Sequence, residues 1–76
     1  MYALNKSEII TASEDYLLVL CDSIYKSKDF AKVENNIAKA SKIRLGLKAL
    51  ENTDLPLLTQ DRILIGLNNL CQIYND

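Results

Sequence analysis

A stripe of apolar residues in the middle of the chain constrains the fold more than any other sequence feature. Its members are Val33, Ile37, Ala40, Ile43, Leu47 and Leu50. Spacings of 4, 3, 3, 4 and 3 residues place these side chains on one side of an α-helix. The stripe covers too few heptads for a long coiled coil. It therefore predicts a helix over residues 29–50 that packs in a bundle.

Two further segments show the same periodicity. Residues 7–26 carry Ile10, Leu17, Cys21 and Ile24 at helical spacing. A strand over residues 16–20 is the alternative there, but no partner strand is visible elsewhere. Residues 57–74 carry a wide apolar stripe, made of Ile63, Leu64, Leu67, Leu70, Cys71 and Tyr74. We expect a helix in each segment.

The residues between these segments are typical of helix ends. Thr11 and Glu14 fit a capping box, with Asn5 and Ser7 as alternative caps. Ser27 or Asp29 can cap the second helix. The third can begin at Pro56, the only proline, or at Thr59.

The links between the three segments are short, which makes neighbouring helices antiparallel. The sequence therefore predicts an all-α protein, an antiparallel three-helix bundle forming one helical domain over residues 1–76. The alternative is a helical hairpin that completes its core as a homodimer. With 76 residues, 49% hydrophobic and 25% charged, the chain has the composition of one small globular domain.

Both glycines lie inside predicted helices, within the shared pattern I-x-x-G-L-x-x-L. Gly46 and Gly66 each lie between large apolar residues, at a cost of about 1 kcal/mol relative to alanine. In an antiparallel hairpin they would lie within about one helical turn of each other. They predict a tight crossing of the second and third helices.

The functional groups of most enzymes are missing from the sequence. There is no histidine and no nucleophile, phosphate-loop or dinucleotide motif, so we expect no enzymatic activity, no metal and no cofactor. Cys21 and Cys71 are expected to be buried free thiols; a disulfide between them is the alternative. The longest apolar run has six residues, and the start does not resemble a signal peptide. We expect a cytoplasmic protein without a membrane partner.

Charge is distributed unevenly, although the net charge is only −1. Residues 26–48 hold seven of the nine basic residues, and both flanking segments are acidic. Lys28, Lys32, Lys39 and Lys42 form a predicted basic strip opposite the apolar stripe. Such a strip is either a solvated face or a surface for an acidic partner.

More large apolar residues are present than a domain of this size can bury. Those off the main stripes include Leu4, Ile9, Leu57 and Leu58. The predicted partner-binding residues are Leu18, Val19, Leu45, Ile65 and Ile73. Together they would make a patch larger than monomers normally expose. The expected partner is another protein, including a second copy of this chain.

We therefore expect a small non-catalytic protein–protein interaction module of the adaptor, inhibitor, immunity-factor or chaperone type. The alternative is a nucleic-acid-binding regulator that uses the basic strip, although the negative net charge and the lack of interleaved aromatics disfavour it. A helix-turn-helix is disfavoured too, because the second link is too long. Usage rich in Ile, Leu, Lys and Asn would suit an AT-rich bacterial or phage genome.

Overall fold

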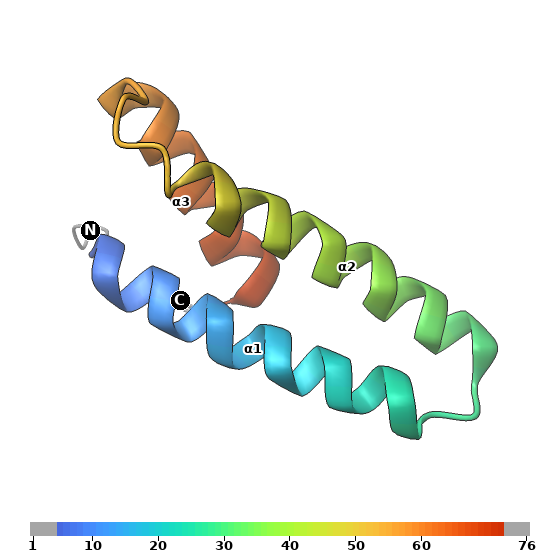
Figure 1. Ribbon diagram of the computed structural model, residues 1–76. Coiled ribbons are helices and arrows are strands. Elements are labelled where there is room, and N and C mark those ends of the chain that lie inside the picture. Colours follow the sequence, from blue (N-terminus) through green and yellow to red (C-terminus); the bar gives the residue numbers. More distant parts are fainter. Residues whose placement is uncertain (1–4, 73–76) are drawn as a thin grey trace.

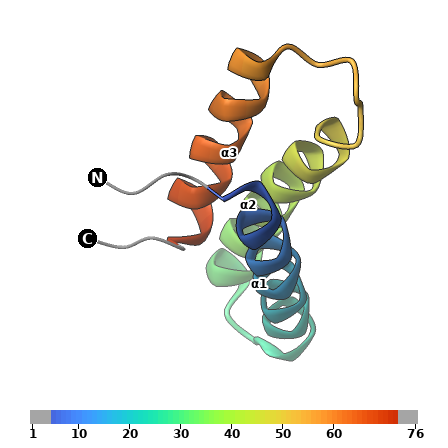
Figure 2. The same cartoon turned by 90° about the vertical axis from the view of Figure 1, so that its left-hand side faces the viewer.

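Three helices make up the described part of the protein. The computed structural model describes residues 5–72, with α1 over Lys6–Lys26, α2 over Phe30–Ala49 and α3 over Leu57–Cys71 (Figure 1). The helices α1 and α2 run antiparallel as a hairpin, and α3 packs obliquely across it, so that each helix contacts both others (Figure 2). The prediction of an all-α three-helix bundle is confirmed, and residues 16–20 are helical.

Side-chain caps begin two of the helices. The Asn5 side chain accepts a hydrogen bond from the Glu8 N–H at 3.1 Å, and Asp29 accepts from Ala31 and Lys32 at 3.1 and 3.3 Å. The predicted capping box at residues 11–14 is wrong as a helix start, because Asn5 caps α1 more than a turn earlier. No side chain caps α3, which begins directly after Pro56.

The core lies where α3 covers the hairpin. Its buried residues are Ile9, Ser13, Leu20, Ile43, Leu50, Leu64 and Leu67. On α2 the one buried residue, Ile43, belongs to the C-terminal half, and the buried Leu50 follows as the C-cap. On α1 only Leu20 of the buried residues lies in the half nearest the α1–α2 link. The link half of the hairpin, meaning residues 17–26 and 30–41, is therefore essentially a two-helix structure.

This uneven coverage overturns several predicted burial assignments. Ile9, expected off the main stripe, is fully buried, whereas Cys21, expected inside, is exposed. Ile37, a member of the central stripe, is 48% exposed. The physical reason is the position of α3, which packs on the side of α1 that carries Ile9 and Ser13. Cys21 and Ile37 lie on the opposite side of the hairpin, which α3 does not cover.

The two glycines do not meet. An alanine Cβ at Gly46 would lie 3.1 Å from Leu67 Cδ2 and 3.5 Å from Ile63 Cγ2, so α3 packs closely on α2 at this point. A Cβ at Gly66 would meet nothing within 4 Å. The predicted tight crossing is thus an approach of α3 side chains to the backbone of α2 at Gly46, and Gly66 takes no part in it.

Polar contacts set the register of the three helices. Across the hairpin, Asn36 donates to Ser23 Oγ at 3.1 Å and Lys39 Nζ lies 3.4 Å from Tyr16 Oη. At the other end, Lys6 Nζ donates to Gln60 Oε1 at 3.1 Å, which joins α1 to α3. Within residues 5–72, none of the helices combines the length and apolar character needed to cross a bilayer.

Candidate functional site

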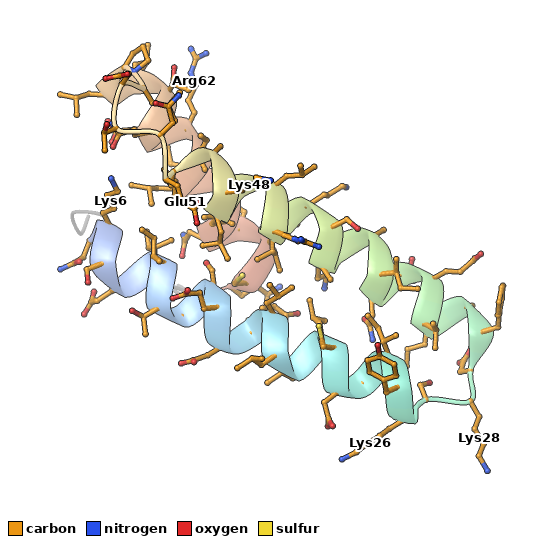
Figure 3. The ribbon with its side chains drawn as sticks, viewed as in Figure 1. Lys6, Lys26, Lys28, Lys48, Glu51 and Arg62 are labelled. Carbon is orange, nitrogen blue, oxygen red and sulfur yellow. The ribbon has the colours of Figure 1, made fainter. Side chains whose placement is uncertain are left out.

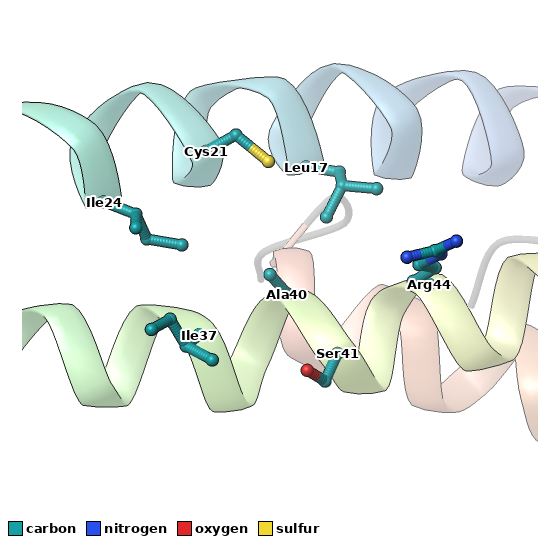
Figure 4. Close-up of a pocket in the computed structure, with 7 residues that line it drawn as sticks. All are labelled: Leu17, Cys21, Ile24, Ile37, Ala40, Ser41 and Arg44. Atoms are coloured by element: carbon teal, nitrogen blue, oxygen red, sulfur yellow. The ribbon is translucent and has the colours of Figure 1, made fainter.

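An apolar groove runs between α1 and α2 on the side of the hairpin away from α3. It has a volume of about 370 Å³. Its lining residues are Leu17, Cys21, Ile24, Ile37, Ala40, Ser41 and Arg44. In Figure 4, side chains from both helices extend toward the space between them, and α3 lies behind. We call this feature the hairpin groove.

The local sequence explains why the groove stays open. Leu17, Cys21 and Ile24 recur at helical spacing, but they lie to one side of Ser13 and Leu20, which face the core. Opposite them, the small side chains of Ala40 and Ser41 leave the space between the helices unfilled. Large residues at the edges and small ones in the middle make a concave apolar surface, the usual shape of a binding site.

The two helices that form the groove carry opposite net charge. Helix α1 has four carboxylates against two lysines, a net charge of −2, whereas α2 has five cations against one carboxylate, a net charge of +4. Arg44 lies in the groove itself, and it also lines an adjoining hollow of about 350 Å³ with Leu45 and Lys48. The groove is therefore apolar along its floor, carries one cation, and lies between two helices of opposite net charge.

The four predicted apolar partner-binding residues that the structure describes are exposed and come from three different helices. Leu18 and Val19 lie on α1, Leu45 on α2 and Ile65 on α3, with Leu18 and Leu45 about 70% exposed. Leu45 alone among them lines one of the two hollows. Ile73 lies outside the described residues.

The predicted basic strip is interrupted in its middle. Lys32 and Lys42 are exposed on α2, and Lys28 extends from the α1–α2 link, away from the bundle (Figure 3). Lys39 is half-buried instead, with its Nζ 3.4 Å from Tyr16 Oη and 5.8 Å from the centroid of the Tyr16 ring. An attraction to the aromatic face holds this lysine against α1.

A small polar cluster lies where the C-terminal end of α3 meets the hairpin. The Cys71 thiol donates to the hydroxyl of the buried Ser13 at a sulfur–oxygen distance of 3.8 Å. Burial raises the pKa of the Cys71 thiol, against smaller opposing effects of Ser13 and Lys39. The thiol therefore stays protonated at neutral pH, which suits a hydrogen-bond donor in the core and not a nucleophile.

Other chemistry is sparse in the part of the chain that the structure describes. Residues 5–72 contain no group of three or more side chains of the metal-binding types that could hold an ion. Comparison with protein-family models, with curated proteins and with solved structures finds no match to this chain.

The apolar residues of the hairpin groove were predicted as members of the buried stripes. Their periodicity predicts a buried side and does not say which element covers it. The groove lies on the side of the hairpin away from α3, and the apolar stripes alone do not show on which side of the hairpin α3 packs.

Proposed function

We propose that the protein is a small non-catalytic protein-binding module and that the hairpin groove is its binding surface. The observation that carries the proposal is the open apolar floor made by Leu17, Cys21, Ile24, Ile37 and Ala40. An exposed concave apolar surface is typical of a site that accepts an amphipathic helix. Burial of its side chains would supply affinity, and the charges of the two helices would orient the partner.

The alternative function, nucleic-acid binding, has less support. It depends on a continuous basic strip, and Lys39 in the middle of that strip is held against Tyr16. The net charge of −1 also opposes association with a polyanion. No second functional class is therefore proposed.

Site-specific photo-cross-linking in the native cell tests the proposal. A benzophenone amino acid replaces Ile37 in the groove or, as the matched control, Leu58, an exposed apolar residue on α3. We expect position 37 to cross-link to protein and position 58 not to do so. Absence of any protein adduct from position 37, or equal adducts from both positions, would contradict the proposed function.

A further inference from the structure

We infer that the occupant of the hairpin groove is a second copy of this chain, paired so that α1 of each copy lies on α2 of the other. This inference rests on the proposed function, because it takes the groove to be the protein-binding surface. Two hairpins packed through these faces would form a four-helix bundle, the arrangement in which a helical hairpin ordinarily completes its core.

The apolar surface of the hairpin extends beyond the groove. Phe30 precedes Ile37 by seven residues, or two helical turns, and so lies on the same side of α2. Tyr25 follows Cys21 by four residues on α1. Phe30 and Tyr25 are 75% and 90% exposed, as large as any side chains in the described part of the chain. A single helix laid in the groove would leave these aromatic residues at the edge, whereas a second hairpin would cover them.

The size of this face fits a dimer interface. Two helices of about 20 residues, each about 30 Å long and 10 Å wide, present roughly 600 Å² in projection. The accessible area of a corrugated helical surface exceeds its projection. A stable interface buries about 800 Å² of accessible surface on each partner. The hairpin face is therefore of the size that self-association requires.

Charge selects between the two ways in which identical hairpins can pack face to face. If α1 lies on α1 and α2 on α2, two helices of net charge +4 meet. If the two-fold axis runs along the hairpin, α1 with its net charge of −2 meets the basic α2 of the other copy at both contacts. The second arrangement is complementary and keeps facing helices antiparallel, so we assign it to the dimer.

The register of the hairpin then predicts a specific ion pair. The contacts of Ser23 with Asn36 and of Tyr16 with Lys39 place Glu14 at the level of Arg44. Glu14 precedes Cys21 by seven residues and therefore lies on the groove side of α1. Rotation about a two-fold axis along the hairpin leaves the position of each residue along that axis unchanged. Glu14 of one copy therefore faces Arg44 of the other.

Light scattering over a range of protein concentrations tests the dimer. We expect the mass to rise from that of the 8.6 kDa chain to twice that value. Ile37→Glu should raise the dissociation constant by about 100-fold, because it places an unpaired carboxylate in the apolar floor. The matched control Leu58→Glu, at a still more exposed position on α3, should leave the constant unchanged. Circular dichroism checks that both variants remain helical.

Charge reversal tests the arrangement. Arg44→Glu alone should weaken the dimer by about tenfold, and the double variant Glu14→Arg with Arg44→Glu should restore it. Failure of the double variant to restore affinity, or a disulfide forming readily between the two Cys21 residues, would overturn the assigned arrangement in favour of α1 on α1.

The two proposals fail in different ways. A wild-type chain that stays monomeric at every concentration overturns the dimer. If position 37 then still cross-links to a different protein, the proposed function stands with another occupant. A dimer that Ile37→Glu leaves intact overturns the assignment of self-association to the groove.

Discussion

At the scale of single residues, the two glycines differ in whether the structure has room for a side chain in their place. Alanine is preferred over glycine inside a helix by about 1 kcal/mol. At Gly66 no atom lies within 4 Å of the position that an alanine Cβ would take, so nothing opposes that gain. At Gly46 the same Cβ would lie 3.1 Å from Leu67, and overpacking of this kind costs about 1–3 kcal/mol.

We therefore expect Gly66→Ala to raise the free energy of unfolding by about 1 kcal/mol. Gly46→Ala should be less stable than Gly66→Ala by about 1 kcal/mol or more, because Leu67 has to move away from α2. Urea unfolding at one fixed protein concentration measures both. Equal gains for the two variants would mean that α3 does not pack closely on α2 at Gly46.

At the scale of helices, Asp29 determines where α2 begins. The Asp29 side chain accepts hydrogen bonds from the Ala31 and Lys32 N–H groups, and the Asp29 N–H donates to Ser27 Oγ at 3.2 Å. Removing such a cap costs about 1 kcal/mol. We expect Asp29→Ala to lower the free energy of unfolding by that amount, as measured by chemical denaturation.

Asn is the matched control for this cap, since its side-chain oxygen can accept the same hydrogen bonds without a charge. Asp29→Asn should retain most of the stability that Asp29→Ala loses. If both variants were equally destabilised, the negative charge near the positive end of the helix dipole would be responsible, and not the hydrogen bonds.

The helices themselves were predictable because each carries its own periodic stripe and end signals. Asp29 was among the expected caps, and the start of α3 beside Pro56 followed from the chemistry of proline. The start of α1 was not fixed by the sequence, since Asn5, Ser7 and Thr11 can each cap a helix, and the structure shows the cap at Asn5. Periodicity therefore identified the elements better than their first residues.

At the scale of the whole molecule, the sequence predicted three antiparallel helices but not which part of the α1–α2 hairpin α3 covers. An apolar stripe gives the direction of burial on each helix, and the oblique placement of α3 depends on contacts between distant residues, such as Leu67 with Gly46. That placement turned the expected core residues Cys21 and Ile37 into groove residues. The sequence therefore did not reveal the candidate site, because its apolar residues have the same spacing as buried core residues.

The same uneven coverage predicts that the hairpin unfolds from its link end. Ile43 in the C-terminal half of α2 and Leu50 at the C-cap of α2 are buried, whereas Leu20 is the one buried residue of the described link half. Local opening is easiest where few apolar contacts are lost. In the monomeric variant Ile37→Glu, amides of residues 22–26 and 30–36 should exchange about tenfold faster than those of residues 43–49.

Hydrogen exchange followed by mass spectrometry measures this difference, and wild-type protein at high concentration supplies the comparison. A second copy over the groove adds most of its contacts to the link half, so the protection of the link half should rise toward that of residues 43–49. Uniform protection in the monomeric variant would mean that the bundle opens as one unit. Protection that does not depend on concentration in the wild type would mean that no second copy covers the link half. A single chain, with its partial core, predicts fast exchange of the link-half amides. A pair of chains with a completed core predicts slow exchange of the same amides, so the link half distinguishes the two states.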